Sequence, residues 1–455
     1  MEDNPIRSLA YDELQAAVGG DAAAIRLILK FEPAGGLEDK VFPPTYAGGV
    51  YAFEDRRIGE KTARAVLLDS VQSQANRLEL ALLRAFRDGD VTFPLISVDF
   101  GGKVEGQNKL STLEAPHRLA DAIFRDSHVG AELFRESALG KRFAAANIRN
   151  ATAMLELCPT ALIFGVWDST GAAGGLGNKF ARALVSEIIA MNAVAGVRTS
   201  SRVDPLGIEK CPLYEAEDGT WTVDQEEAKK DAEGEPVPFK RKKSDKGKPS
   251  EINHGNVTPD LVRYADNATV ANPLKTSEIA VNYSLSSEDG TIATRSNVKT
   301  ADVLIRKGDV AAGGVSMTHA LQTTVLSMPA LRRLCFPDDK GKSTTERNNA
   351  ARTLLAALAL VAISYQRKHG YFLRSRCDLL PVDQPVFEIV TTTTDVTKFT
   401  LSAKEAVAIY KKTVEVAKKA RLPWPEEEII LTPKPALVQL VNRSRELAAL
   451  EDGEE

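Results

Sequence analysis

The 455-residue sequence has few cysteines and histidines, and none of them stands in a metal-binding or redox pattern. Four cysteines form no CxxC pair, so the sequence predicts neither a zinc ribbon nor a thioredoxin-type site; they are Cys158, Cys211, Cys335 and Cys377. The five histidines form no HExxH motif. We therefore expect reduced thiols in a cytoplasmic protein that uses no metal or other cofactor.

The sequence also lacks long hydrophobic runs. The longest apolar stretch, Ala351 to Ser364, is interrupted by Arg352 and is too short to cross a membrane, so it predicts a buried helix. The first ten residues are charged and lack the apolar core of a secretory signal. We expect no membrane partner.

Neither sign of charge dominates, and aromatic residues are scarce. The chain has 58 Lys and Arg against 62 Asp and Glu, a net charge of -4 and a pI of about 5.9. Because general nucleic-acid binders usually have a high pI, the total argues against such a protein. The 43% hydrophobic content excludes a disordered chain. The 6% aromatic content disfavours base stacking and favours recognition of a backbone.

Hydrophobic patterning predicts an α+β fold, because strands and helices alternate without strict βαβ regularity. The predicted strands are 22–31, 95–100, 161–167, 279–284, 291–294, 303–307, 371–376 and 386–391. The predicted helices are 61–87, 180–195, 354–364, 402–421 and 437–450, with helical turns in 115–139. The remaining stretches are turn-rich at 32–49 and 308–316, and charged at 205–259.

A glycine-rich loop, Gly171 to Lys179, lies between a predicted strand and a predicted helix. Glycines let backbone N–H groups approach a phosphate, and a helix N-terminus favours negative charge. The loop fits neither GxxxxGK[ST] nor GxGxxG, because Asn178 precedes the lysine and Phe180 takes the place of Ser/Thr or glycine. Three interpretations remain: a site for the phosphate of a polymer backbone, which we favour, a structural turn, or a phosphate- or nucleotide-binding enzyme.

No catalytic constellation is evident. Asp168 and Ser169 end a predicted strand, where a capping Asp in a turn is the commoner role. His319 could contact a ligand, although partly buried histidines with satisfied hydrogen bonds are more frequent, and the same applies to His117 and His128. We expect a protein that is not an enzyme.

Basic residues gather in clusters, several of them next to glycine-rich turns. Such clusters are usually solvated faces, but Lys and Arg beside glycines can also follow a phosphate backbone. The clusters are Lys103 with Lys109; Arg135, Lys141, Arg142 and Arg149; Lys179 with Arg182; Arg198 with Arg202; Arg332 with Arg333; and Arg367, Lys368, Arg374 and Arg376.

Three motifs carry a family resemblance: SVQSQANRLE at 70–79, GVWDSTG with GGLG and KFAR within 165–182, and SRVDPLG at 201–207. With them the chain, from about Arg26 to about Leu380, resembles the Csb-type RAMP protein of type I-U CRISPR systems, now called type I-G. That protein is the Cas-seven-type backbone subunit of the Cascade complex. The resemblance implies an α+β fold with a modified RRM-like (ferredoxin-like) palm and inserted fingers and thumb.

The resemblance also implies partners. Several copies would stack along one CRISPR RNA (crRNA) in the cytoplasm and support its pairing with target DNA. The Cascade large subunit and a Cas-five/Cas-six-type subunit would complete the complex. The palm would comprise residues 20–210, with a helical insertion at about 103–150, and residues 261–400. Residues 211–260 would form a charged insertion, either a thumb or a mobile loop. Residues 401–455 would form C-terminal helices and an acidic tail.

A subunit that accepts any spacer must bind sugar and phosphate and leave the base edges free. We therefore expect Gln72, Asn76 and Arg77 to face RNA, or else Asn76 and Arg77 to stabilise the palm from within. The further predicted RNA-binding residues are Lys103, Lys141, Arg142, Gly174, Gly175, Asn178, Lys179, Arg182, Arg202 and His319. A nucleic-acid-contacting loop is predicted at Lys240, Arg241, Lys242 and Lys243, with a solvated mobile loop as the alternative. A self-stacking subunit also needs acidic surface to meet its neighbour's basic surface, which a near-neutral chain can provide.

Overall fold

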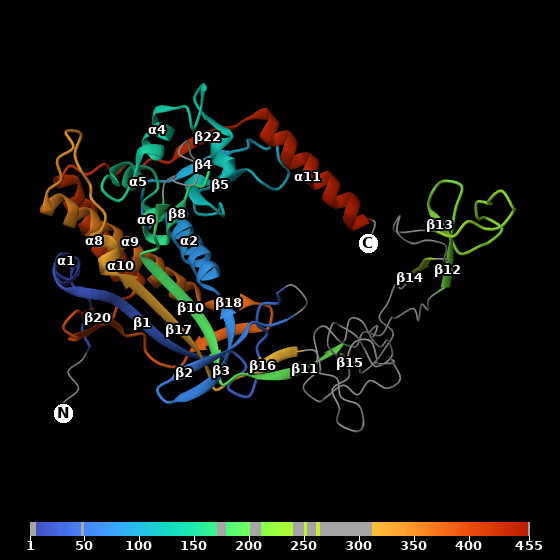
Figure 1. Cartoon of the computed structure of the whole chain (residues 1–455), viewed down its shortest axis with the longest axis horizontal. Coiled ribbons are helices and arrows are strands. Elements are labelled where there is room, and N and C mark those ends of the chain that lie inside the picture. The colour runs from blue at the N-terminus through green and yellow to red at the C-terminus, as the bar shows by residue number, and fades with distance from the viewer. Residues whose placement is uncertain are drawn as a thin grey trace. The chain divides into compact units, whose positions relative to one another are not determined.

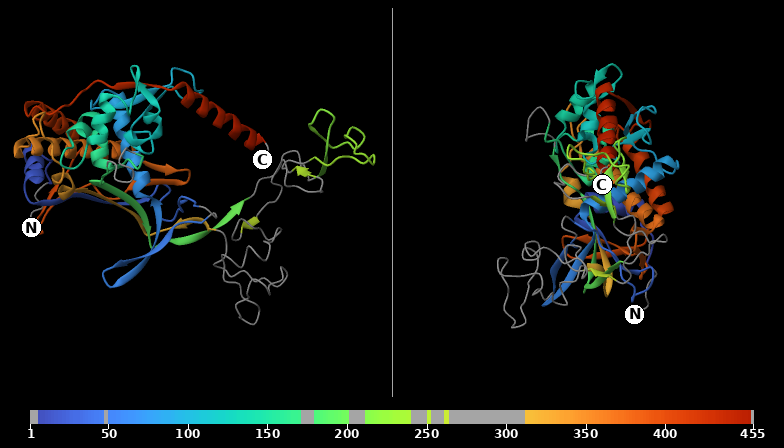
Figure 2. Two further views of the ribbon diagram at one scale, coloured as in Figure 1. Left: turned by 45° about the horizontal axis from the view of Figure 1, so that its top comes forward. Right: turned by 90° about the vertical axis from the view of Figure 1, so that its right-hand side faces the viewer.

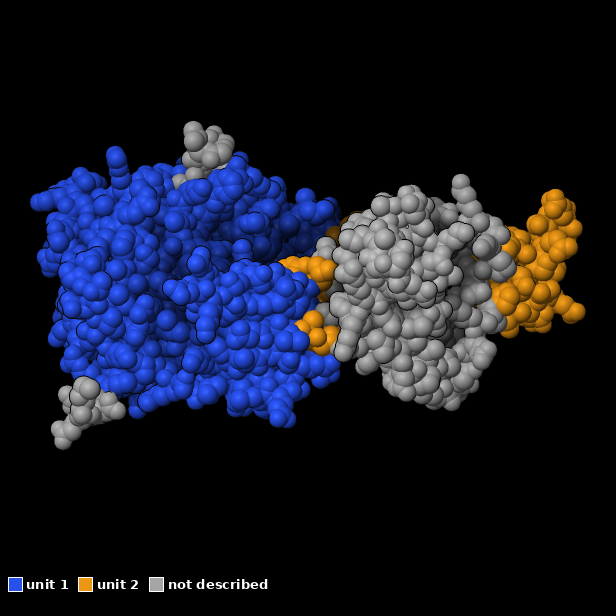
Figure 3. Space-filling view, turned by 60° about the horizontal axis from the view of Figure 1, so that its bottom comes forward, with its two compact units in different colours: residues 1–44, 51–194, 315–441 blue, residues 45–50, 195–314, 442–455 orange. Residues whose placement is uncertain are grey.

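The computed structural model describes residues 6–46, 50–170, 179–200, 211–239, 250–252, 261–263 and 312–453 (Figure 1). The chain divides into two compact units, which Figure 3 colours separately. The first comprises residues 1–44, 51–194 and 315–441, and the second 45–50, 195–314 and 442–455.

A nine-stranded antiparallel sheet forms the framework of the first unit (Figures 1 and 2). Its spatial order is β18-β19-β1-β17-β10-β3-β2, and β20 pairs with both β1 and β21. The strands are β1 (Ala22–Pro33), β2 (Phe53–Ile58), β3 (Lys61–Asp69), β10 (Leu184–Met191), β17 (His319–Ser327), β18 (Tyr371–Arg374), β19 (Cys377–Pro381), β20 (Phe387–Thr391) and β21 (Val396–Phe399).

Helices cover one face of this sheet (Figure 1). They are α1 (Tyr11–Gly19), α2 (Val71–Arg87), α8 (Met328–Arg332), α9 (Thr345–His369) and α10 (Ala403–Lys419). Helix α9 is buried almost continuously from Ala350 to Gln366 and contacts α1, α2 and α10, so it forms the centre of the helical layer. The predicted buried helix at 354–364 is thus confirmed.

A smaller sheet, β5-β4-β22-β6-β7, joins an inserted region to the C-terminal part of the chain. Its parallel pairing of β22 with β4 brings Leu431 opposite Val98. The strands are β4 (Ile96–Asp99), β5 (Lys109–Ser111), β6 (Ser127–Val129), β7 (Glu132–Leu133) and β22 (Ile429–Pro433). The same region holds the 3-10 helix η1 (Arg118–Ala120), helices α3 (Ala122–Arg125), α4 (Ala138–Ala145), α5 (Thr152–Leu157) and α6 (Pro159–Phe164), and the hairpin of β8 (Val166–Trp167) with β9 (Lys179–Phe180).

The second unit contains two three-stranded sheets, β15-β11-β16 and β13-β12-β14. Their strands are β11 (Val194–Ser200), β12 (Cys211–Glu215), β13 (Trp221–Thr222), β14 (Ser250–Ile252), β15 (Leu261–Arg263) and β16 (Ala312–Ser316). The last helix, α11 (Pro435–Gly453), begins in the first unit and ends in the second.

Several sequence predictions for individual elements are wrong, although the α+β class is confirmed. The predicted helix 61–87 is strand β3 followed by α2, because Asp69 and Ser70 interrupt it and Ser70 caps the helix. The predicted strand 161–167 is mostly helix α6, whose first residue is Pro159. This segment is buried on all sides, and such an apolar run shows no periodicity that separates helix from strand.

The predicted helix 180–195 is also wrong, because β10 fills most of it. Ser186 is buried and its neighbours Val185 and Glu187 are more exposed, which is the two-residue period of a strand. The turn-rich stretch 308–316 contains β16, and 115–139 contains β6 and β7 besides its helical turns. The predicted strands at 279–284, 291–294 and 303–307 lie outside the described residues.

Candidate nucleic-acid interface

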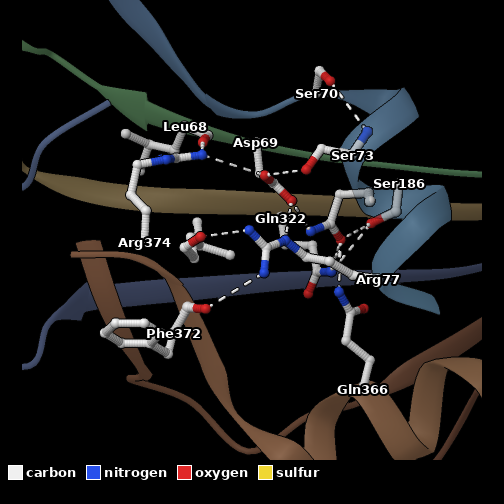
Figure 4. A network of polar contacts seen from close by, with 12 residues as sticks. Leu68, Asp69, Ser70, Ser73, Arg77, Ser186, Gln322, Gln366, Phe372 and Arg374 are labelled. Atoms are coloured by element: carbon white, nitrogen blue, oxygen red, sulfur yellow. Dashed lines mark hydrogen bonds and ion pairs between the residues drawn. The ribbon is translucent and has the colours of Figure 1, made fainter. Parts of the chain in front are cut away.

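Helix α2 begins directly at the end of β3, and the buried carboxylate of Asp69 marks this junction (Figure 4). Asp69 accepts hydrogen bonds from Ser73 Oγ at 2.7 Å and from Arg77 Nε at 2.9 Å. Arg374 Nη2 lies 3.5 Å from the other side of the same group. Two guanidinium groups thus face one carboxylate, which leaves an excess of positive charge at the start of the helix.

Gln74 fixes the orientation of α2 on the sheet. Its Nε2 donates to Asp69 at 2.6 Å, and its Oε1 accepts from Ser186 Oγ at 2.9 Å and from Gln322 Nε2 at 3.0 Å. Gln366 of α9 donates to the same oxygen at 3.1 Å. Because all these groups are buried, their hydrogen bonds determine which face of α2 points outward.

Three predicted RNA-binding residues lie on or beside that outward face. Gln72 and Asn76 are exposed, and within the described part of the chain neither side chain makes a hydrogen bond to protein. Arg77 is drawn inward, because it donates to Asp69 and also to the carbonyl of Leu373 at 2.6 Å. The structural role weighed for Arg77 is thus present in the fold, while Gln72 and Asn76 remain available to a ligand.

A cavity of about 550 Å³ elsewhere in the first unit has mixed charge, but one of about 220 Å³ beside α2 is cationic. Arg77 and Arg84 of α2 line the smaller cavity together with His369, and no Asp or Glu among the described residues does. Two of its lining residues are exposed apolar side chains, Leu80 at 43% and Phe372 at 64%. A cavity with cations, an aromatic ring and no carboxylate suits an anionic ligand with a planar group.

The proton affinity of His369 reflects these cations. Burial, with the positive charges of Arg84 and Lys368, holds the pKa of His369 below its usual range, although Asp88 acts in the opposite direction. His369 is therefore neutral near pH 7 in the free protein, and an anion bound in the cavity would raise its pKa.

A second candidate surface is the β8–β9 hairpin, the stem of the predicted glycine-rich loop. Trp167 is 55% exposed there, and Lys179 Nζ lies 5.3 Å from the centre of its ring. Asp168 is buried and accepts from Arg135 at 2.6 Å. Burial opposes ionisation, but Arg135 prevails and holds the pKa of Asp168 below its usual range. Thr170 N–H also donates to Asp168, so the predicted capping role is confirmed.

A buried ion pair connects this hairpin to α2. Arg118, at a φ of 51°, donates to both carboxylate oxygens of Glu79, at 2.6 and 2.7 Å, and to the carbonyl of Gly165 at 2.8 Å. Burial raises the pKa of Glu79 to about 6, although Arg118 and Arg182 lower it. Gly165 has a φ of 82°, and a Cβ there would lie 2.9 Å from Arg182 Cγ, so only glycine fits.

The other described site residues are spread over the first unit. Lys179 and Arg182 lie at the hairpin, and Lys103 lies in a turn after β4. Lys141 and Arg142 lie on α4, where Arg142 pairs with Glu156. His319 lies on the sheet face opposite the one that α2 covers, and burial together with Lys30 lowers its pKa. The structure thus does not bring His319 to the α2 face.

Eight predicted site residues fall outside the described part of the chain. They are Gly174, Gly175, Asn178, Arg202, Lys240, Arg241, Lys242 and Lys243. The helix expected to follow the glycine-rich loop is absent, because the chain continues as β9 and β10. A helix N-terminus therefore cannot supply the phosphate contact that the loop was predicted to make there.

Sequence reasoning missed four residues of these surfaces: Arg84, His369, Phe372 and Trp167. His369 and Phe372 lie almost 300 positions from α2, so no local pattern could connect them with it. Arg84 follows Arg77 by seven residues, which places both on one helix face, and that spacing was available as a signal.

Features typical of enzymes are few in what the structure describes. Among the described residues, no three His, Cys, Asp or Glu side chains gather closely enough to hold a metal ion. Burial raises the pKa of the Cys158 thiol, and that of Cys377 to about 11, which disfavours the reactive thiolate. None of the described helices combines the length and apolarity that crossing a membrane requires.

Comparison with known families matches residues 25–195 to the family described as CRISPR-associated protein GSU0053 (Cas_GSU0053). Over this segment the chain is similar to that CRISPR-associated family. The match confirms the resemblance to a Csb-type, Cas-seven-type protein, and it includes α2, Glu79, Arg118 and the β8–β9 hairpin. No curated protein matches the chain.

Proposed function

We propose that the chain is the crRNA-binding backbone subunit of a type I-G CRISPR surveillance complex. The observation that carries the proposal is the cationic cavity beside α2, which no Asp or Glu of the described residues lines. The same helix carries the exposed amides of Gln72 and Asn76. Helix α2 belongs to the segment that matches a CRISPR-associated family, whereas residues 366 and 369–373, which complete the cavity, lie outside that segment.

The order of elements supports an RRM-like palm. Strand β1, helix α2, strands β10 and β17, helix α9 and strand β20 follow one another as β-α-β-β-α-β. In space these strands are ordered β20-β1-β17-β10, with both helices on one face. The β2–β3 hairpin is then an insertion between β1 and α2.

Binding at the α2 face would not read bases. Arg84 and the excess positive charge around Asp69 would neutralise phosphates, and the amides of Gln72 and Asn76 would bond to phosphate or ribose oxygens. Phe372 and Trp167 offer rings on which any base can stack. Such contacts accept every spacer, which is what a guide-holding subunit requires.

The proposed role is structural. The alternative, an enzyme built on the Gly171–Lys179 loop, needs a phosphate site at the start of a helix, and β9 follows the loop instead. We infer no catalytic step. The proposed partners are target DNA paired to the guide, further copies of the chain, the large subunit and a Cas-five/Cas-six-type subunit. We also propose that Lys240 to Lys243 contact nucleic acid.

A binding measurement with two unrelated guides tests the role. Filter binding with two crRNAs that differ only in spacer sequence should give equal affinities, because the proposed contacts reach only backbone and ring faces. An RNA duplex of the same length serves as the comparison and should bind more weakly, because its bases are not free to stack. A strong preference for one spacer, or turnover of a nucleotide, would contradict the proposal.

A further inference from the structure

A third cavity, of about 390 Å³, lies in the first unit between the end of α9, strand β19 and the start of α10. It differs from the α2 cavity in most of its lining, and the two share Gly370 and Tyr371. Apolar residues form most of its lining, among them Leu29, Leu379, Leu380 and Leu401. We call it the α9–β19 pocket.

Two buried or half-buried polar side chains of this pocket lack a polar partner: one has no hydrogen bond and the other has no counter-ion. Ser364 is 97% buried, since its exposure is 3%, and its hydroxyl has no hydrogen-bond partner in the described structure. Arg367 is half-buried and donates to the carbonyl of Leu401 at 3.1 Å, but no carboxylate pairs with it among the described residues. A partly desolvated cation without a counter-ion favours an anionic ligand.

The lining charges specify that ligand further. Lys368 joins Arg367 at the pocket, and Asp378 is the one acid among the described lining residues, which together carry a net charge of +1. A nucleic-acid phosphate would gain little from the leucines and prolines that surround these cations. The lining suits a segment that combines apolar side chains with carboxylates.

Helix α11 of this chain has that chemistry. Its first turns pack in the core through Leu437, whereas Leu440 is 66% and Leu447 is 47% exposed. The two leucines are seven residues apart and therefore share one helix face. Glu446 is exposed but pairs with Arg443 of the same helix, and the acidic character comes from residues 447–455, which contain four acids and no base.

We propose that the α9–β19 pocket of one copy receives the leucine face and acidic end of α11 from a second copy. The leucines would meet the apolar lining, and the carboxylates would meet Arg367 and Lys368. Because the two surfaces differ, the contact is head-to-tail and repeats along a chain of copies. The inference specifies the self-stacking contained in the proposed function, but it requires no RNA.

Two double variants separate the two surfaces. K368E/L380E alters the exposed rim of the pocket, and L440E/L447E alters the helix face; all four positions are exposed, so the fold should persist. The control is V396E/K398E, which, like K368E/L380E, replaces one apolar side chain and one lysine with glutamate, but on strand β21, outside the pocket.

Sedimentation velocity of the full-length chain without RNA is the test. The unaltered protein and the control should associate at about 100 µM or below, and each double variant alone should associate at least about tenfold more weakly. An equimolar mixture of the two double variants should form a heterodimer and nothing larger, because one intact pocket and one intact helix remain.

Other results would overturn the proposal. Association of either double variant at the unaltered strength, or an unaltered chain that stays monomeric, would contradict it. A mixture that stays monomeric would contradict it as well. A monomeric unaltered chain together with a mixture that forms a heterodimer would place α11 in its own chain's pocket instead. Binding of a short crRNA by each variant is measured in parallel: its loss in every protein would reject the proposed function and leave the contact between copies standing.

Discussion

At the residue scale, Asp69 fixes the position of α2 on the rest of the fold, because its buried carboxylate contacts two arginines and a glutamine. Arg77 belongs to this cluster, whereas Arg84, seven residues on, only lines the cavity. The two arginines share a helix face and differ in role. Arg77 stabilises the fold, whereas Arg84 forms no ion pair with another described residue and can bind a ligand.

Arg77→Ala is expected to lower the free energy of unfolding by about 2 kcal/mol, because Asp69 and the Leu373 carbonyl each lose a buried partner. Arg84→Ala should leave that free energy within about 0.5 kcal/mol of the unaltered value. Urea unfolding of both variants measures the difference. Equal stability of the two would refute the division of roles.

RNA affinity should rise as the pH falls, because the pKa of His369 is depressed in the free protein and a bound phosphate raises it. Binding then takes up a proton, and we expect a gain of up to about tenfold between about pH 7.5 and pH 5.5. His369→Gln should reduce this gain. An unchanged pH profile in the variant would exclude His369 from the interface.

At the scale of elements, the Glu79–Arg118 pair joins α2 to the loop before β8. The raised pKa of Glu79, about 6 against an ordinary 4.5, means that the folded state binds this proton more tightly than the unfolded state. The stability that the group contributes is therefore fully present below about pH 4.5 and is lost as the pH rises through about 6.

Glu79→Gln removes this titration and keeps the shape of the side chain. Relative to the unaltered protein, the variant should gain about 1–2 kcal/mol of stability between about pH 4.5 and pH 7.5, measured by urea unfolding. Glu79→Ala, which leaves Arg118 unpaired, should be destabilised by about 3 kcal/mol at either pH. A relative loss of stability by Glu79→Gln as the pH rises would contradict the raised pKa.

Some elements could be predicted from the sequence and others could not. Alternation in β1 and the capped, amphipathic α10 were predictable, because their patterns are local. Helix α6 and strand β10 were not, since α6 is buried on every side and β10 has an apolar run that suits a helix equally well. The exposed polar face of α2 was foreseen from Gln72 and Asn76, but the cavity beside it depends on Phe372 and His369, which tertiary pairing alone brings there.

At the scale of the whole molecule, the net charge of -4 conceals local excesses. The α2 cavity is cationic, while residues 447–455 are acidic. Such segregation of charge suits the proposed subunit, which would bind RNA on one surface and a second copy of the chain on another. The total charge alone would have argued against RNA binding.

The central claim is that the α2 cavity holds an RNA phosphate, and the salt dependence of crRNA binding tests it most directly. Arg87 is the matched control for Arg84, because both lie in the last turn of α2 but Arg87 pairs with Glu114 and does not line the cavity. Arg84→Ala should weaken binding of every spacer equally and reduce the slope of log affinity against log salt by about 0.7, the value for one phosphate contact to a single strand. Arg87→Ala should keep the slope of the unaltered protein. Equal slopes for Arg84→Ala and the unaltered protein would contradict the account.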